Sequence, residues 1–254
     1  MSETKELVYN KDHYTVIAND VVRGKQEMTL QEAKILRLVI TQVAREDKDL
    51  KTYTCNIQEL ADFLSIDDSN LYRSIADICR NLIKRSVEIS TGDKSQPWKM
   101  FNWIQQAEYD GKGNITLMLS EQIKPFVLDL NQYFTQYQLS NILEMSSFYA
   151  IRLYELLKTD EFKRQTKYEY SIEFLRQFFD CNNKHKKMSD FRRYVIDIAI
   201  KEINTKSDLY IDDVEWIKKG RKYDKVIFHL QLGYFYGFRR NLSETKIKRD
   251  FFGE

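Results

Sequence analysis

The sequence is poor in proline, glycine and cysteine. Its 254 residues include two prolines, eight glycines and three cysteines. So little proline and glycine argues against long disordered or low-complexity segments. The cysteines, Cys55, Cys79 and Cys181, are odd in number and far apart, so the pattern excludes a disulfide framework and a zinc cluster. The same cysteine pattern fits a reducing compartment. The length of the chain and a hydrophobic content of 43% are sufficient for one or two packed domains.

Long apolar runs are also missing. No run approaches the roughly 18 residues that a membrane-spanning helix needs. The first residues, "MSETKELVYNKDHY", contain no apolar core of a secretory signal. We therefore expect a cytoplasmic protein with no membrane partner.

Motifs for catalysis are absent as well. The three histidines, His13, His185 and His229, are far apart, and no His-x-His metal pair accompanies a nucleophilic tyrosine as a rolling-circle nickase would require. The stretch "GKGN" at 111–114 lacks the Gly-Lys-Ser/Thr ending of a phosphate-binding loop and is typical of a hairpin turn. We predict a protein that is not an enzyme and that needs no metal or cofactor.

Charge is unevenly distributed along the chain. Residues 1–132 carry 17 Lys and Arg against 20 Asp and Glu, whereas residues 133–254 carry 23 against 18. The C-terminal half is therefore the better candidate for binding a polyanion. Because the excess is small, an acidic partner must be contacted by local basic patches.

The two halves of the chain repeat one pattern. The block "YTCNIQELADFL" from Tyr53 matches "YEYSIEFLRQFF" from Tyr168, and each is typical of a short strand that enters a helix. An amphipathic helix is expected before each block, in "TLQEAKILRLVITQV" and in "SSFYAIRLYELLK". Thr29 and Glu32 have the spacing of a capping box, and Ser147 is expected to cap the second helix in a similar way.

A third helix and a strand hairpin are expected after each block. The inward stripe of the third helix is predicted to be Leu71, Ile75, Ile78 and Leu82 in the first half, and Phe191, Val195, Ile198 and Ala199 in the second. Strand patterns follow, with turns at "DGKGN" and "KKGRKYD". This order predicts an α+β fold of two tandem winged helix-turn-helix domains, related by an internal pseudo-twofold duplication. We place the domains at residues 1–130 and 131–254.

Three further stretches suggest a family. They are "NKDHYTVIANDVVRGKQEMTLQEAKIL", "SEQIKPFVLDL" and "YFTQYQLSNILEMSSFYAIRLYELLK". Together with the two repeats in order, they give a chain that resembles the replication initiator proteins of theta-replicating, iteron-type bacterial plasmids. The resemblance implies sequence-specific binding to repeated double-stranded DNA (iterons) at a plasmid origin. It also implies origin opening with a host initiator and recruitment of the host replicative helicase.

Self-association is a second implication of the resemblance. Dimers of such proteins repress their own promoter, and the N-terminal domain mediates dimerisation and also contacts DNA. The C-terminal domain is then expected to be the main iteron-binding domain. Two other functions stay open at this point: a transcriptional repressor with the same fold, and a relaxase-type replication enzyme.

The predicted DNA contacts of the second domain surround its third helix and its wing. A winged helix places its third helix in the major groove and its wing along the backbone or minor groove. A helical wheel favours Arg193 for the groove and leaves Arg192 at the flank undecided. Lysines before the helix lie near the positive end of its dipole, an unfavourable position that a bound phosphate would offset. The alternative interpretation of these lysines is an ordinary solvated helix entrance. For the wing, the alternative is a charged edge that resists aggregation. The candidates are Lys184, Lys186, Lys187, Ser189, Arg192, Arg193, Lys218, Lys219, Arg221 and Lys222.

The candidates of the first domain are fewer. Arg73 and Arg80 lie opposite the apolar stripe of the third helix, and Ser69 and Asn70 precede them at the helix start, where N–H groups can meet phosphate. An equally good interpretation is a ladder of ion pairs with Asp77 on a solvated face. The loop before this helix, "SIDDSN", is acidic, whereas the longer loop in the second domain is basic.

The aromatic stretch "PWKMFNWIQQAEY" is predicted to form strand. Side chains alternate between the two faces of a strand, so Trp98, Phe101 and Trp103 cannot all be buried by one small sheet face. We expect at least two of them in the core and the remaining one in a contact with a second subunit or domain.

Overall fold

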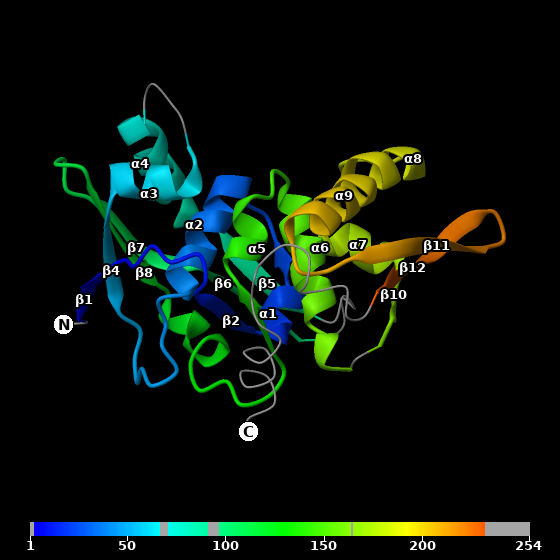
Figure 1. The fold of residues 1–254 in the computed structure, drawn as a ribbon, viewed down its shortest axis with the longest axis horizontal. Coiled ribbons are helices and arrows are strands. Elements are labelled where there is room, and N and C mark those ends of the chain that lie inside the picture. The colour runs from blue at the N-terminus through cyan, green and yellow to red at the C-terminus, as the bar shows by residue number, and fades with distance from the viewer. Residues whose placement is uncertain (1–2, 67–70, 91–96, 164, 232–254) are drawn as a thin grey trace.

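The computed structural model describes residues 3–66, 71–90, 97–163 and 165–231. Two copies of one motif dominate it, each consisting of a helix, a strand, two more helices and a hairpin (Figure 1). In the first copy these elements are α2 (Leu30–Ile40), β4 (Thr52–Asn56), α3 (Ile57–Leu64), α4 (Leu71–Leu82), β7 (Ile104–Tyr109) and β8 (Asn114–Leu119). In the second they are α6 (Phe148–Lys158), β10 (Lys167–Ser171), α7 (Ile172–Phe178), a third helix that runs as α8 (Met188–Phe191), a π turn (Arg192–Ile196) and α9 (Asp197–Lys206), and then β11 (Ile211–Lys219) and β12 (Lys222–Leu230).

The sheets of the two copies have the same strand order. The first contains β4-β8-β7 and the second β10-β12-β11, all antiparallel. Tyr53 lies opposite Leu117 in one sheet, and Tyr168 lies opposite Phe228 in the other. All four side chains are buried in the core. The predicted α+β fold of two winged helices is therefore confirmed.

The first copy carries additional strands. β1 (Thr4–Glu6) extends its sheet in parallel to β4, and β3 (Lys25–Gln26), β5 (Ser86–Ser90) and β6 (Trp98–Asn102) form a separate sheet in that order. A further pair joins β2 (Tyr14–Ala18) to β9 (Phe134–Gln138). The short helices α1 (Asn19–Arg23) and α5 (Ser140–Leu143) and two 3-10 segments, at Glu121–Phe126 and Glu161–Lys163, complete the described elements. Since β9 pairs with β2, the start of the predicted second domain is bonded to the first, and the boundary near residue 130 stays a prediction.

The aromatic stretch divides between two sheets at Trp103. The indole of Trp103 is fully buried, and Phe101 stacks on Phe126 with ring centroids 5.5 Å apart. Trp98, at the start of the edge strand β6, is 64% exposed. The expectation that two of the three aromatics belong to the core is confirmed.

Helix starts follow the sequence in one case and depart from it in another. Thr29 and Glu32 form the predicted capping box of α2. The prediction that the Ser147 side chain caps α6 is wrong, because its hydroxyl makes no capping bond. Instead, the Glu202 carboxylate of α9 accepts bonds from the backbone N–H groups of Ser146 and Ser147, at 2.7 and 3.2 Å. A carboxylate is favourable there because the helix N-terminus is positive.

In the third helix of the second domain, the predicted buried stripe is wrong at Ile198. This side chain is 38% exposed, whereas Phe191, Val195 and Ala199 are buried as predicted. The cause is a π-helical turn at Arg192–Ile196 between α8 and α9. A π turn holds one residue more than an α turn, so the later inward positions shift away from Ile198.

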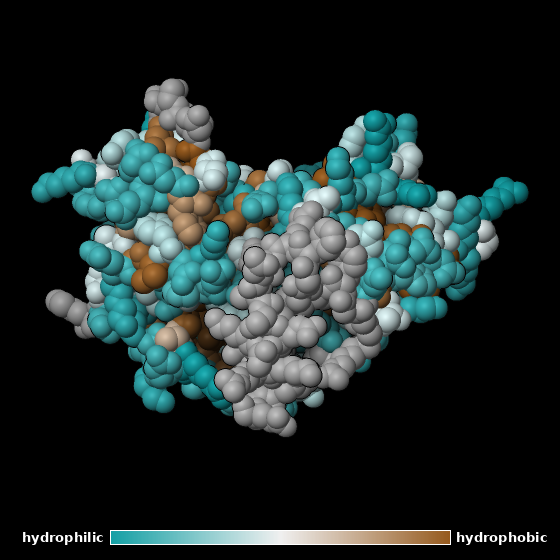
Figure 2. Space-filling view, viewed as in Figure 1, coloured by the Kyte–Doolittle hydropathy of each residue, from teal (hydrophilic) through white to brown (hydrophobic). Residues whose placement is uncertain are grey.

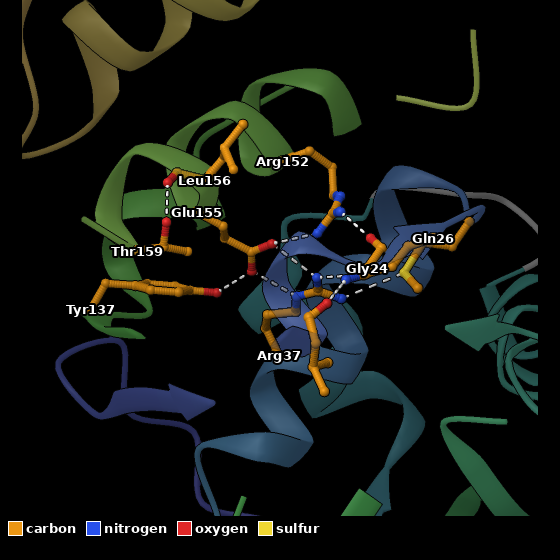
Figure 3. Close-up of polar contacts among 10 residues, drawn as sticks. Gly24, Gln26, Arg37, Tyr137, Arg152, Glu155, Leu156 and Thr159 are labelled. Atoms are coloured by element: carbon orange, nitrogen blue, oxygen red, sulfur yellow. Dashed lines mark hydrogen bonds and ion pairs between the residues drawn. The ribbon is translucent and has the colours of Figure 1, made fainter. Parts of the chain in front are cut away.

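A buried polar cluster joins α2 to α6 (Figure 3). The Arg37 guanidinium donates to both carboxylate oxygens of Glu155, at 2.9 and 3.0 Å, and the Tyr137 hydroxyl donates to the same carboxylate at 2.6 Å. Arg152 lies 3.5 Å from Glu155 and donates to the carbonyl of Gly24 at 2.7 Å. Burial disfavours the charged carboxylate, but Arg37 outweighs it and holds the pKa of Glu155 below its ordinary value. The two repeats are thus fixed to each other through charge.

The cysteines are all buried and free of disulfide bonds, as the sequence predicts. Within the described ranges, no helix is long and apolar enough to cross a membrane.

Candidate nucleic-acid interface

The third helix of the second domain presents a polar outer face. Its inner residues Phe191 and Val195 are buried, and Ser189, Arg192 and Arg193 are exposed on the other side. The Arg193 guanidinium lies 5.3 Å from the ring centroid of Tyr194, and the side chain is exposed. This position is suited to contact with a groove, as the helical wheel predicts.

Arg192 points toward the wing. Its guanidinium lies 5.4 Å from the ring centroid of Trp216 on β11, and its Nε lies 3.8 Å from Oδ1 of Asp197. The side chain is 54% exposed. Arg192 therefore occupies the angle between the third helix and the hairpin.

The lysines of the loop before α8 have different environments. Lys184 lies 3.4 Å from Glu27 of the first domain and 3.7 Å from Asp180, which in turn binds Lys25 at 2.9 Å. The hydrogen bond to Asp180 raises the pKa of Lys25. Lys184 is thus part of an exposed ion-pair chain between the domains. Such pairs are weak and screened by salt, so Lys184 remains available to phosphate.

The other two lysines of the loop, Lys186 and Lys187, are exposed, and Lys187 occupies the N-cap position of α8. Its side chain makes no capping bond. Two cations at the positive end of a helix are electrostatically unfavourable in the absence of an anion. The structure therefore keeps the predicted basic patch at the helix entrance.

The wing is a long two-stranded hairpin. β11 and β12 are joined by Gly220 and Arg221, and Gly220 has a φ of +65°, as a tight hairpin turn requires. Lys218, Lys219, Arg221 and Lys222 are all exposed at or next to this tip. Lys219 and Lys222 lie directly opposite each other in the ladder, which is unfavourable for like charges. A phosphate between them would remove that cost.

On the third helix of the first domain, by contrast, two arginines share one aspartate. Arg80 binds Asp77 at 2.6 Å, and Arg73 lies 3.9 Å from the same carboxylate. The predicted ion-pair ladder is thus present, with Arg73 still 86% exposed. Ser69 and Asn70 lie outside the described residues. DNA contact by Arg73 or Arg80 stays a prediction.

The candidate elements of both domains lie along one edge of the molecule. Figure 1 shows α4 and α8–α9 at the same edge, with hairpins β7–β8 and β11–β12 extending outward at opposite ends. Figure 2 shows hydrophilic residues over α8 and over the outer end of β11–β12. One elongated partner could therefore contact both third helices.

Comparison with known proteins agrees with this architecture. Residues 15–158 match the family model described as "Initiator Replication protein, WH1", and residues 171–230 match "Initiator Rep protein, WH2". The chain belongs to the initiator replication protein family. This initiator is 23% identical over 240 residues to a "Replication initiation protein" of Escherichia coli, an alignment that covers 91% of the chain and 73% of the relative.

A solved structure shares the fold of this initiator. It is a Pi initiator protein, crystallised in complex with iteron DNA, with a TM-score of 0.68 and 21% sequence identity. The similarity covers 87% of this chain and 98% of the other. Two winged helices in tandem are therefore an arrangement that this initiator shares with a protein of known structure.

Arg176 is a residue of the initiator that sequence reasoning missed. Its Nη1 donates to the carbonyl of His185 at 3.1 Å and its Nη2 to that of Lys186 at 3.2 Å, while the guanidinium lies 4.6 Å from the Phe191 ring centroid. His185 has a φ of +51°, a strained left-handed conformation that these bonds stabilise. Arg176 thus holds the basic loop through its backbone carbonyls. The signal in the sequence is an arginine in the last turn of the second helix, directly before that loop.

Proposed function

We propose that this protein initiates plasmid replication by binding repeated origin DNA, the iterons, through both winged helices. The observation that carries the proposal is the common edge formed by the third helices, with exposed cations on the helix, the loop and the wing of the second domain. The Pi initiator protein, whose fold is similar, was crystallised with iteron DNA. The more basic surface of the second domain supports its role as the main iteron-binding domain.

Host partners and self-association extend the proposal. By family resemblance, the bound protein opens the origin with a host initiator and recruits the replicative helicase, and a dimer represses the initiator's own promoter. Exposed Trp98 and Met100 on the edge strand β6 support dimerisation through the first domain, since an uncovered apolar edge favours pairing with another chain. We further propose that the protein is not itself an enzyme and acts in the cytoplasm.

The DNA-binding part is tested with duplexes of the tandem repeats beside the gene. Fluorescence anisotropy should show binding about a thousandfold tighter than to a shuffled duplex at physiological salt. Equal affinity for both duplexes would contradict the proposal. Binding to a lone inverted repeat, with no tandem repeats present and no strand opening, would indicate a dedicated repressor.

The absence of catalysis is tested on supercoiled origin DNA with a divalent metal. The expected product is intact supercoiled DNA, with local strand opening detected by permanganate only when the host initiator is added. Strand cleavage that a tyrosine substitution abolishes would identify a relaxase-type enzyme instead.

A further inference from the structure

The π turn in the third helix of the second domain brings together two residues that an α-helix would separate. In an α-helix, residues five apart point about 140° away from each other. Here the backbone N–H of Asp197 bonds to the carbonyl of Arg192, five residues earlier. Their side chains therefore emerge on the same side, with Nε and Oδ1 3.8 Å apart.

Stability does not account for this pair. Both side chains are about half exposed, 54% for Arg192 and 53% for Asp197, and an exposed ion pair contributes little to folding. π turns are rare and occur frequently at functional sites. The turn lies in the third helix, the element that winged helices place in the major groove.

Three groups constrain the plane of the Arg192 guanidinium. Asp197 faces its Nε, the Trp216 ring lies 5.4 Å from its centre, and the π turn sets the position of its Cα relative to Asp197. No described residue accepts a hydrogen bond from its Nη groups. A guanidinium that is half exposed and held in this way has the donor groups for a bidentate contact to O6 and N7 of guanine.

Asp197 also argues for a base rather than a phosphate as the partner. A carboxylate beside a phosphate-binding arginine would repel the DNA backbone. Beside a base edge it carries a smaller cost, and it fixes the direction of the arginine. The phosphate contacts are accounted for separately by the loop lysines and the wing tip.

We propose that Arg192 recognises one guanine in each repeat, and that Asp197 and Trp216 are positioning residues that orient its guanidinium. This inference rests on the proposed function and names the residue that confers specificity. It requires the π turn, because without that turn Asp197 would not face Arg192.

The experiment measures affinity for a repeat in which each base pair is replaced in turn. Arg192→Lys, which keeps the charge but has no guanidinium fork, should lower discrimination about 10- to 100-fold at one G·C pair and leave the other positions unchanged. Asp197→Asn should lower discrimination at the same pair, while affinity for shuffled DNA stays equal or rises because a negative charge is removed. The double variant should lose no more discrimination at that pair than Arg192→Lys alone.

Asp212→Asn is the matched control. It removes an exposed carboxylate from β11 of the same domain and should leave base preference unchanged. Circular dichroism and thermal unfolding verify that each variant is folded. The inference is overturned if Asp197→Asn changes preference at a different base pair from Arg192→Lys, or if neither variant changes it. Failure of the wild-type protein to prefer the repeat at all would instead refute the proposed function.

Discussion

The two winged helices of this protein have the same fold and different surfaces. In the first, the arginines of α4 are paired with Asp77, and the wing tip carries Asp110, whose pKa is held below its ordinary value by hydrogen bonds from Asn114. In the second, the loop, helix and wing present exposed cations, and Asp197 lies beside Arg192. The same fold thus occurs twice in the chain, and the exposed cations lie mainly on the second copy.

The additional strands complete the comparison. The first domain has a sheet, β3-β5-β6, without a counterpart among the described residues of the second. Its edge strand exposes Trp98 and Met100. The first domain thus has fewer unpaired cations and carries the apolar edge. This difference fits the proposal that the first domain mediates self-association and the second binds DNA.

The largest expected effect is on stability, when the buried ion pair between Arg37 and Glu155 is removed. Arg37→Met leaves the Glu155 carboxylate buried with only Tyr137 and the more distant Arg152, and should lower the free energy of unfolding by about 3–5 kcal/mol. Urea denaturation followed by circular dichroism measures this. Arg80→Met, which removes an exposed pair, is the control and should change stability by no more than about 0.5 kcal/mol. Equal effects of the two substitutions would show that the buried cluster does not join the copies.

The second prediction tests the apolar edge of the first copy. Trp98→Ala should weaken dimerisation by about 2 kcal/mol or more, because large aromatic side chains dominate interfaces. Sedimentation equilibrium gives the dimer dissociation constant. Tyr133→Ala removes an aromatic that is 76% exposed and lies outside the β3-β5-β6 sheet, and should leave the constant unchanged. A dimer that is insensitive to Trp98→Ala would place the interface elsewhere.

The third prediction compares the third helices directly. Arg193→Ala should weaken binding to the repeat by about 1–3 kcal/mol, and Arg73→Ala should weaken it less, because Arg73 already lies beside the Asp77 carboxylate. Gel shifts on the same duplex give both values. The reverse order would make the first domain the main DNA-binding domain.

The smallest expected change in DNA affinity, measured at any single salt concentration, comes from substitutions in the basic loop. Replacing Lys186 and Lys187 by Gln should reduce the slope of log K against log salt by about 0.9 for each phosphate that the loop no longer neutralises. Replacing exposed Lys5 and Lys11 of the first domain by Gln is the control and should leave the slope unchanged. A slope unaffected by the loop substitutions would show that these lysines do not bind phosphate.

Local patterns in the sequence are enough to predict much of this architecture. Helical spacing and the matched Tyr53 and Tyr168 blocks depend on neighbours in sequence, so both motifs and the Thr29 capping box can be inferred. The bonds from Ser146 and Ser147 to Glu202, and from Arg37 to Glu155, cannot, because their partners are distant along the chain. They form only once tertiary packing brings the helices together.

The candidate site is predictable to a similar extent. Exposed cations follow from composition and the helical wheel, which identify the loop and wing residues. The π turn does not follow, because periodicity assumes a constant 3.6 residues per turn. Ile198 is misplaced for the same reason, and Arg192 cannot be assigned without knowing that Trp216 and Asp197 lie beside it.

The π turn also has a consequence for how repeat specificity could evolve. Its extra residue is equivalent to a one-codon insertion in the gene. Deleting one codon within 193–196 would restore an α turn and leave the following helix in nearly the same orientation, because a π turn accommodates its extra residue locally. The carboxylate of Asp197 would then be four residues after Arg192, still one turn away, so we expect the pair and its base preference to tolerate this change in length.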